Sequence, residues 1–235
     1  MKKLLYFIPV CLVIYSFANQ QPSKVSKNQT KPKIDTTYMV LMKTTMGDIT
    51  LKLYNETPKH RDNFIDLVKK NFFDSLLFHR VINNFMIQGG DPNSKNAQAG
   101  AMLGDGDVGY TVPAEFNTKL IHKKGVLAAA RNDNPEKASS GCQFYIVQGK
   151  KTDSLTLNML EKRNGLQYTA EQRKIYQTIG GTPFLDNSYT VYGETISGIE
   201  VVDRIAVVPG DGSNRPNTNI YILSTKLIIT TAKVK

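Results

Sequence analysis

The stretch FHRVINNFMIQGGDP, which spans Phe78–Pro92, places an arginine and a glutamine in an otherwise apolar run. If it folds as two short antiparallel strands, Arg80 comes close to Phe85, Met86 and Gln88. Arginine carries a permanent charge and five N–H donors, so such a surface could polarise an acceptor atom of a ligand held against apolar side chains. The alternative is a core hairpin whose arginine extends to water. The stretch alone does not decide between the two.

Strand alternation gives the side chains of this stretch a direction. Phe78, Arg80 and Ile82 are predicted to share one face, with His79 and Val81 on the opposite face. His79 would then point away from the arginine. We therefore assign it to the structure, as a core histidine whose ring nitrogens have hydrogen-bond partners.

No other catalytic motif accompanies this stretch. The sequence contains no G-x-S-x-G, Walker, H-E-x-x-H or C-x-x-C pattern. The histidines His60, His79 and His122 are widely separated, which argues against a metal site. The tripeptide His60-Arg61-Asp62 resembles a kinase motif, but it lies in a predicted helix and no Gly-rich phosphate loop precedes it. No metal or cofactor is expected, and His122, like His79, is assigned to the structure.

Length and composition describe an ordinary globular protein. The chain has 235 residues, which suits one medium-sized domain with a sizeable core. Hydrophobic residues make up 40% and charged residues 21%. The net charge is +10, but the basic residues are scattered and no nucleic-acid-binding motif accompanies them. We predict a solvated basic surface and no nucleic-acid partner; a basic binder of nucleic acid or membrane surfaces is the competing class.

Residues 1–18 are predicted to be a secretory signal peptide. Lys2 and Lys3 precede the apolar run LLYFIPVCLVIYSFA, and Ser16–Ala18 has the small-x-small pattern of a cleavage site. Residues 19–36 are polar and read as a flexible linker. The protein is therefore expected to be exported, to the periplasm or the outer surface. An uncleaved membrane anchor is the alternative, because the run is only slightly shorter than the roughly 20 residues of a membrane span.

Short strand-like runs dominate the rest of the chain, which predicts a mainly β fold, a sandwich or a closed barrel. One helix is expected at residues 56–74, with Thr57 at the N-cap and Pro58 at the first helical position. A short helix is expected to open the segment 198–208. The predicted strands cover residues 38–45, 49–54, 76–82, 85–90, 110–116, 125–131, 142–149, 190–198 and 220–230.

Residues 152–182 interrupt the rhythm of strands and are predicted to be a helical insertion. The first helix ends at Asn164-Gly165. The second begins with Thr169 and Gln172, which have the spacing of a capping box. The insertion could widen or restrict substrate choice, or it could be decoration.

The stretch at residues 78–92 resembles the signature of cyclophilins, the family of peptidyl-prolyl cis-trans isomerases. The resemblance runs from about Tyr38 to Thr230, and this chain looks like a bacterial, exported member of the family. It implies a closed eight-stranded antiparallel barrel capped by two helices, over a domain at residues 37–233. It also implies that the substrates are Xaa-Pro segments of unfolded or exported polypeptides. The further matching segments are ETPKHRDNF (56–64), GYTVPAEF (109–116), HKKGVLAAAR (122–131), SSGCQFYIV (139–147) and FLDNSYTVYGETISGIEVVDRI (184–205).

Carried over residue by residue, the resemblance implies a groove with two sets of residues. Alternation supports part of this assignment, since Gln143 and Tyr145 would face the groove while Cys142 and Phe144 face the core. Cleavage would leave Cys142 as the only cysteine, so no disulfide is expected and the thiol is assigned to the core. The implied catalytic residues are Arg80, Phe85 and Gln88, and the implied substrate-binding residues are Met86, Ala130, Arg131, Gln143, Tyr145, Phe184, Leu185 and Tyr189.

Four of these positions depart from the best-known family pattern. Arg131 stands in place of an Asn, Tyr145 of a Phe, Phe184 of a Trp and Tyr189 of a His. Bacterial members share such changes, so isomerase activity is still implied, whereas the loss of the Trp argues against tight cyclosporin binding. The competing function is a non-catalytic chaperone that holds proline-containing segments in the same groove. In either case a monomer is expected, with membrane contact only if the N-terminal segment stays uncleaved.

Overall fold

The computed structural model describes residues 34–233, so the predicted signal peptide and nearly all of the predicted linker lie outside the described range. The first strand begins at Ile34, inside the predicted linker, because residues 34–36 pair with residues 231–233. No helix within residues 34–233 is long and apolar enough to cross a membrane. The elements are β1 Ile34–Thr44, β2 Gly47–Leu53, α1 Pro58–Lys69, β3 Phe78–Ile82, β4 Met86–Gly89, η1 Pro92–Ser94, β5 Thr111–Val112, β6 Val126–Ala129, β7 Ser139–Ser140, β8 Phe144–Val147, α2 Ser154–Asn164, α3 Ala170–Thr178, η2 Pro183–Leu185, β9 Val191–Ser197, α4 Ile199–Ala206 and β10 Ile222–Lys233.

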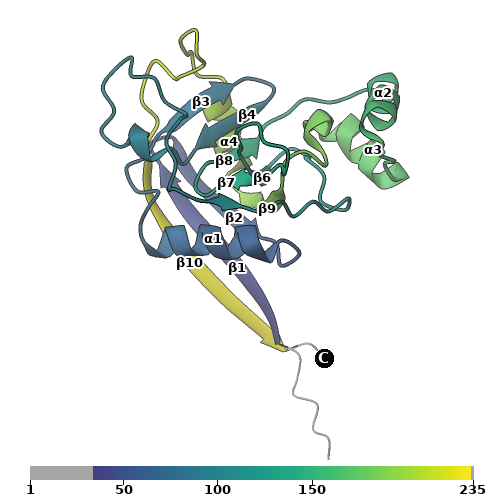
Figure 1. Cartoon of the computed structure of the whole chain (residues 1–235), viewed down its shortest axis with the longest axis horizontal. Helices are drawn as coiled ribbons and strands as arrows, with labels where there is room; N and C mark the ends of the chain where they lie inside the picture. Colours follow the sequence, from purple (N-terminus) through teal and green to yellow (C-terminus); the bar gives the residue numbers. More distant parts are fainter. Residues whose placement is uncertain (1–33, 234–235) are drawn as a thin grey trace, which may run out of the picture.

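Eight strands form one antiparallel sheet in the order β10-β1-β2-β9-β6-β8-β4-β3. The sheet curves around a core of buried apolar side chains (Figure 1). In β2, Ile49, Leu51 and Leu53 are buried while the residues between them are only partly buried, which is the alternation expected of a strand with one face on the core. The mainly β class and the eight antiparallel strands of the main sheet agree with what the family resemblance implies. The short β5–β7 pair forms a separate sheet that sequence alone did not predict.

The predicted closure of the barrel is wrong, because the sheet is a half-barrel. Its edge strands β3 and β10 are joined only around a single bridge between Leu77 and Tyr221. Further along β3, the N–H of Val81 donates to the carbonyl of Asn214, which belongs to the loop before β10. This loop occupies the edge of β3 where a closing strand would pair, so the ladder stays open.

Helix α1 has the predicted N-cap and first residue, Thr57 and Pro58, but the Thr57 side chain makes no capping hydrogen bond. The cap is supplied from a distant loop. The carboxylate of Glu115 accepts the backbone N–H groups of Lys59 and His60 at 3.0 and 2.9 Å. It also lies 2.7 Å from Nδ1 of His60, whose Nε2 lies 3.0 Å from the Ser139 hydroxyl. His60 is thus part of a buried structural link, consistent with our rejection of the kinase motif.

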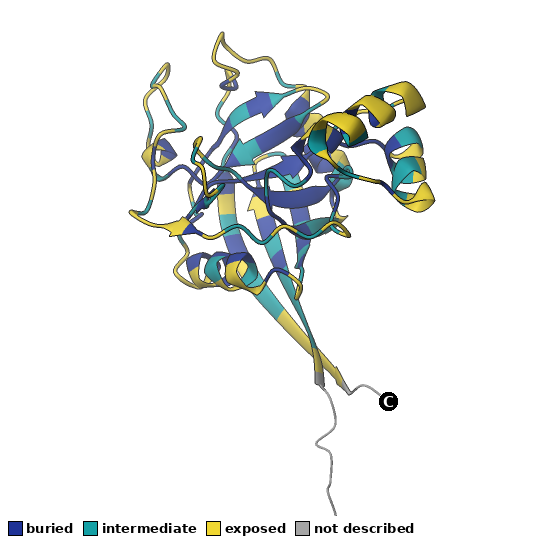
Figure 2. Ribbon diagram, turned by 45° about the vertical axis from the view of Figure 1, so that its right-hand side comes forward, coloured by how far each residue is buried: buried dark blue, intermediate teal, exposed yellow. Residues whose placement is uncertain are grey.

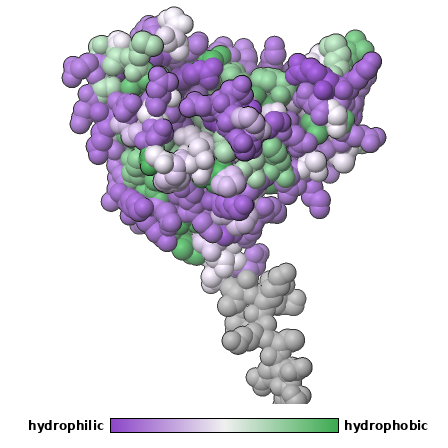
Figure 3. All heavy atoms as spheres, viewed as in Figure 1, coloured by the Kyte–Doolittle hydropathy of each residue, from purple (hydrophilic) through white to green (hydrophobic). Residues whose placement is uncertain are grey.

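The two helices expected in residues 152–182 are present as α2 and α3. Thr169 and Gln172 form the predicted capping box, and Gly165 ends α2 in a left-handed conformation. Helices α2 and α3 form a lobe that projects beside the sheet, and the outer faces of both helices are exposed (Figure 2). In space-filling view the face shown is mostly hydrophilic, with hydrophobic residues visible at the outer end of the lobe (Figure 3). The lobe has its own small core, made of Ile121, Leu157, Tyr168 and Tyr176.

Candidate active site

The β3–β4 hairpin sets Arg80 opposite Gln88, as expected, but the strand alternation fails at its start. Phe78 pairs with Gly89 and Arg80 with Gln88, so His79 is an extra residue in a bulge. As a consequence Phe78 packs in the main core with Val81. The prediction that Phe78 and Arg80 share a face is therefore wrong, because a bulge reverses the alternation.

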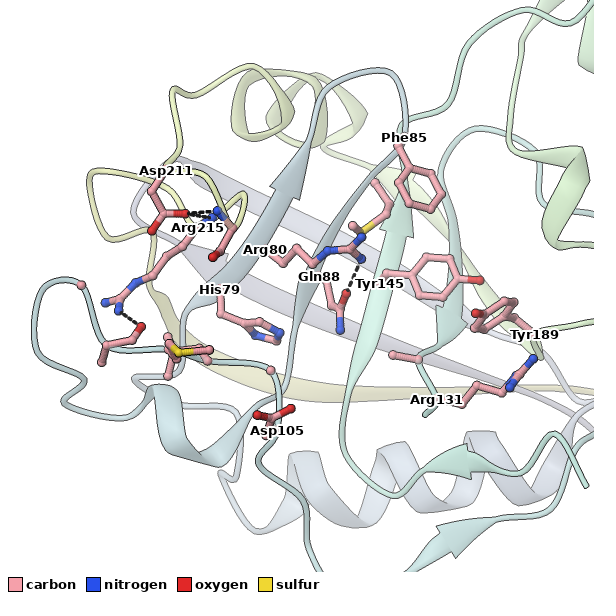
Figure 4. A pocket seen from close by; sticks show the side chains of 18 of the residues that line it. His79, Arg80, Phe85, Gln88, Asp105, Arg131, Tyr145, Tyr189, Asp211 and Arg215 are labelled. Carbon is pink, nitrogen blue, oxygen red and sulfur yellow. Dashed lines mark hydrogen bonds between the residues drawn. The ribbon is translucent and has the colours of Figure 1, made fainter. Parts of the chain in front are cut away.

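A cavity of about 310 Å³ opens beside this hairpin (Figure 4). The cavity lies on the face of the sheet opposite the main core. Residues of a second apolar cluster line it. Nine of the eleven predicted site residues line this cavity: Arg80, Phe85, Met86, Gln88, Ala130, Arg131, Tyr145, Leu185 and Tyr189.

A relay of side-chain amides holds the arginine. Nη1 of Arg80 donates to Oε1 of Gln88 at 3.1 Å, and Nε2 of Gln88 donates to Oε1 of Gln143 at 3.0 Å. Gln143 donates in turn to the carbonyls of Gly104 and Gly106, both at 2.8 Å. The acceptor oxygen of each glutamine is thus occupied within the relay. Both residues therefore act first as a framework for Arg80 and for the loop that contains the two glycines.

The apolar wall of the cavity combines Phe85, Met86, Tyr145 and Leu185. Met86 and Tyr145 are almost fully buried, at 1% and 4% exposure. The guanidinium carbon of Arg80 lies 6.0 Å from the centre of the Phe85 ring. Burial lowers the pKa of Arg80 from its ordinary value, yet arginine stays protonated in proteins. The cavity therefore presents a partly desolvated cation next to an apolar pocket.

The opposite wall is built by two of the residues that depart from the family pattern. The guanidinium carbon of Arg131 lies 4.8 Å from the centre of the Tyr189 ring. Nε of Arg131 donates to the carbonyl of Ser188 at 3.0 Å, which fixes the stack. Tyr189 meets the ring of Tyr145 edge to face at 6.0 Å. Arg131 and Tyr189 therefore form one surface, a cation against an aromatic face.

Two predicted residues do not line this cavity. Gln143 lines a neighbouring cavity of about 450 Å³, and contacts the first one through its hydrogen bonds to Gln88 and to the carbonyl of Gly104. Phe184 is 45% exposed and its ring centre lies 5.5 Å from that of Phe85. Phe184 therefore stands beside Phe85 at the outside of the apolar wall.

Several residues of the cavity were not predicted. Except for His79, which lies in β3 itself, they come from two loops that share no motif with the hairpin, so no local signal pointed to them. Arg215 joins these loops, because its guanidinium donates to the carbonyls of Ala101 and Gln98. The residues concerned are His79, Gly100, Ala101, Met102, Leu103, Gly104, Asp105, Asp211, Ser213 and Arg215.

His79 is buried, but the prediction that its ring nitrogens are satisfied is wrong. Neither Nδ1 nor Nε2 has a hydrogen-bond partner among the described residues, and the ring lines the cavity. Burial lowers the pKa of His79 to about 4, so the imidazole is neutral at physiological pH. The bulge explains the difference, since it turns His79 toward the cavity instead of into a polar pair. His122, by contrast, has partners on both ring nitrogens, as predicted.

Alternation along β8 is regular and was predicted correctly. Cys142 and Phe144 belong to the main core, while Tyr145 lines the cavity. Burial raises the pKa of the Cys142 thiol to about 11, which makes it a poor nucleophile. Within residues 34–233 no group of three or more His, Cys, Asp or Glu side chains is placed to hold a metal ion.

Comparison with known proteins gives one consistent answer. The sequence model of the family described as "Cyclophilin type peptidyl-prolyl cis-trans isomerase/CLD" matches residues 39–227. A protein of Staphylococcus haemolyticus named for peptidyl-prolyl cis-trans isomerase activity is 35% identical over 191 residues, which cover 81% of this chain and 91% of the relative. A Staphylococcus aureus protein of the same name is 36% identical over 186 residues, covering 79% and 89%.

The fold comparison agrees with the sequence comparison. The crystal structure of a cyclophilin type peptidyl-prolyl cis-trans isomerase of Cryptosporidium parvum matches 82% of this chain and 98% of its own, with a TM-score of 0.60 and 23% identity. At that identity the match supports the fold alone. Taken with the family match and the staphylococcal relatives, it shows that this chain belongs to the cyclophilin-type peptidyl-prolyl cis-trans isomerases.

Proposed function

We propose that this protein accelerates rotation about Xaa-Pro bonds of exported polypeptides, with Arg80 as the group that acts on the reacting amide. The observation that carries the proposal is the geometry around this residue. A partly buried guanidinium is held by Gln88 at 3.1 Å beside an apolar pocket in a cavity of about 310 Å³. A pocket of this size and composition suits a proline ring, with the cation at its rim.

The reaction sets modest chemical demands. The amide must pass through a twisted state that loses resonance, at an uncatalysed barrier of about 18–20 kcal/mol. No covalent bond breaks, so neither a nucleophile nor a general base is required. The enzyme needs only to bind the twisted amide more tightly than the planar one.

Arg80 is suited to this difference. In the twisted amide the proline nitrogen regains its lone pair and becomes a hydrogen-bond acceptor, which it is not in the planar amide. Among the described residues, Arg80 makes one side-chain hydrogen bond, from Nη1 to Gln88. Its other N–H groups therefore remain for the substrate, and partial burial strengthens a hydrogen bond from the cation.

The apolar wall would hold the proline ring. Phe85, Met86, Tyr145 and Leu185 surround the space next to the guanidinium. Exclusion of water there favours the twisted amide, whose charge separation is smaller than that of the planar one. Arg131 and Tyr189, stacked on each other, would border the polypeptide next to the proline. In support, the Cryptosporidium parvum cyclophilin has also been crystallised in the presence of the dipeptide Ala-Pro.

Export is the second part of the proposal. It rests on the basic, apolar and small-residue pattern of residues 1–18, which lie outside the described range. We propose a mature chain that begins after Ala18 and works as a monomer in the periplasm or at the outer surface, without cofactor or nucleic acid. Intact mass of the purified native protein tests the cleavage, since a mass that includes residues 1–18 would contradict it.

A refolding assay tests the isomerase against a chaperone that only holds proline segments. A client protein whose slow refolding phase is limited by proline isomerisation should refold faster at catalytic, substoichiometric amounts of this protein. A protein that only holds its client would leave the slow phase unchanged or retard it. Binding to heparin that weakens with salt would instead favour the basic binder considered above.

A further inference from the structure

The lobe formed by α2 and α3 meets the rest of the molecule at a buried carboxylate. Asp186 is 5% exposed and follows Leu185, a residue of the apolar wall. Its Oδ2 accepts hydrogen bonds from the hydroxyls of Tyr168 and Tyr176, at 2.8 and 2.5 Å. Tyr176 lies on α3 and Tyr168 in the link before it, so both donors come from the lobe.

The other oxygen of Asp186 faces the main body. Oδ1 accepts the backbone N–H of His122 at 2.8 Å and lies 2.7 Å from its Nδ1. In a neutral imidazole a proton on Nδ1 leaves Nε2 as an acceptor. Nε2 of His122 lies 3.0 Å from the hydroxyl of Tyr145. The tautomer inferred from the carboxylate therefore makes Tyr145 the donor of this bond.

The tyrosine hydroxyls in this series of hydrogen bonds stay protonated, and so remain donors, at ordinary pH. Burial raises the pKa of Tyr145, Tyr168 and Tyr176 above the usual value of tyrosine. The Tyr145 and His122 rings are also nearly parallel, with an interplanar angle of 12° and centres 6.1 Å apart. The ring of Tyr145 is thus held by both its hydroxyl and its face.

We propose that the lobe positions the wall of the proline pocket, through the hydrogen-bonded chain Tyr176–Asp186–His122–Tyr145. Tyr176 and His122 are positioning residues in this scheme, because neither lines the cavity and both act through Tyr145. The inference rests on the proposed function, in which Tyr145 borders the proline ring. It gives residues 152–182 a role in substrate affinity and explains why a tyrosine stands at position 145.

The hydrogen bonds of Asp186 explain how a change in the lobe reaches Tyr145. The carboxylate has four donors, two from the lobe and two from His122. Loss of the Tyr176 hydroxyl would leave a buried oxygen short of a partner, and the carboxylate would shift toward its remaining donors. His122 bonds both Asp186 and Tyr145, so a shift of the carboxylate moves the acceptor that orients the Tyr145 ring.

Tyr176→Phe is the sharpest probe, since it keeps the ring and removes the hydroxyl that donates to the Asp186 side chain. Catalysis of an Xaa-Pro peptide would be measured in four proteins: wild type, Tyr176→Phe, Tyr145→Phe and the double variant. Leu157→Ala is the control, because Leu157 belongs to the same small core but has no hydroxyl. We expect Tyr176→Phe to raise KM about two- to tenfold with little change in kcat, the range that one net hydrogen bond can account for.

The double variant decides whether the effect runs through Tyr145. In the Tyr145→Phe background, Tyr176→Phe should leave KM unchanged, since the bond to His122 is already lost. Leu157→Ala should lower the melting temperature, but its effect on KM should not depend on whether residue 145 is tyrosine or phenylalanine. An equal rise of KM in both backgrounds, or no rise in either, would overturn the proposal.

A second readout separates this proposal from the isomerase activity itself. The NMR signals of the Tyr145 ring and the Kd of an Ala-Pro-containing peptide can be measured without turnover. Tyr176→Phe should shift the Tyr145 ring signals and weaken peptide binding by the same two- to tenfold factor. If the wild type proved inactive, unchanged ring signals would still overturn the positioning role, whereas shifted signals would support it.

Discussion

Arg80 and Gln88 face each other across the β3–β4 ladder, with Nη1 of Arg80 3.1 Å from Oε1 of Gln88. The contact is the first link of a relay that continues through Gln143 to the carbonyls of Gly104 and Gly106. The direction of the guanidinium thus depends on amides that lie behind it. Loss of any link should loosen the arginine without removing it.

Gln143→Leu tests the relay. The change keeps the approximate size of the side chain but removes the acceptor for Gln88 and the donor to the two glycine carbonyls. We expect kcat/KM for an Xaa-Pro peptide to fall about tenfold or more, because misplacement of a catalytic group by 1 Å can cost about a hundredfold. A protease-coupled assay of Xaa-Pro cleavage measures it.

The matched control for this variant is Gln172→Leu. Gln172 also uses both ends of its amide, but in the capping box of α3 and in a bond to the carbonyl of Thr118. We expect this variant to lose some stability and little activity. Activity of Gln143→Leu equal to that of Gln172→Leu would show that Arg80 does not need the relay.

The buried His79 should make the stability of the protein depend on pH. Burial lowers its pKa to about 4 from 6.5, and no described residue bonds its ring. Between these values the unfolded chain binds a proton that the native protein does not, so the free energy of unfolding falls as pH falls from 6.5 to 4. The largest loss is about 3 kcal/mol, from 1.36 kcal/mol per pKa unit.

Denaturant unfolding at pH 7 and pH 5 in wild type and His79→Gln measures this contribution. The wild type should lose more stability between the two values than the variant. Burial also lowers the pKa of His60, but that residue is present in both proteins and its contribution cancels in the comparison. An identical loss in the two proteins would mean that His79 does not supply the acid sensitivity.

Substitution of Glu115 should lower the stability of the protein without changing its activity. Its carboxylate caps α1 from a distant loop, where the Thr57 side chain makes no capping bond. Glu115→Gln keeps one acceptor oxygen and removes the charge, and should lower the free energy of unfolding by about 1–2 kcal/mol. KM should stay at the wild-type value because Glu115 does not line the cavity.

Glu136→Gln is the control for the loss of charge, since Glu136 is an exposed glutamate. Urea unfolding of both variants makes the comparison. If the two lost equal stability, general electrostatics would account for the effect and the cap would contribute little.

Phe184 predicts weak binding of cyclosporin. The residue stands where the family resemblance implies a tryptophan, and it is 45% exposed beside Phe85. Phe184→Trp adds an indole N–H donor and more apolar surface at this place. Titration calorimetry should show tighter cyclosporin binding to the variant, by about tenfold for one added hydrogen bond to a ligand. Tight binding by the wild type would contradict the expectation.

Regular strands were the part of the site that the sequence predicted best. In β8 and the two residues before it, alternation correctly separated Cys142 and Phe144 from Tyr145, since no irregularity interrupts that segment. In β3 the same reasoning placed Phe78 and Arg80 on one face. It failed there because a bulge at His79 adds one residue to the period, and a bulge has no fixed sequence mark.

Contacts between distant segments were the part that could not be predicted. Glu115 caps a helix whose first turn lies more than fifty residues earlier, and Arg215 joins two loops that share no motif. Alternation gives the side-chain directions within one strand and not its pairing partner. It therefore did not reveal that β3 pairs with a loop instead of β10. The resemblance to the family supplied the groove, and the structure added the framework that supports it.

If Arg80 stabilises the twisted amide, loss of its guanidinium must slow isomerisation without unfolding the protein. Isomerisation of an Xaa-Pro peptide would be followed in the protease-coupled assay for wild type, Arg80→Lys and Arg80→Ala, with circular dichroism to show that each is folded. We expect kcat/KM to fall about 10²–10³-fold in Arg80→Ala, the usual effect of removing one donor to a transition state. Arg80→Lys should recover only part of the activity. A folded Arg80→Ala protein with a kcat/KM close to that of the wild type would show that Arg80 does not stabilise the twisted amide.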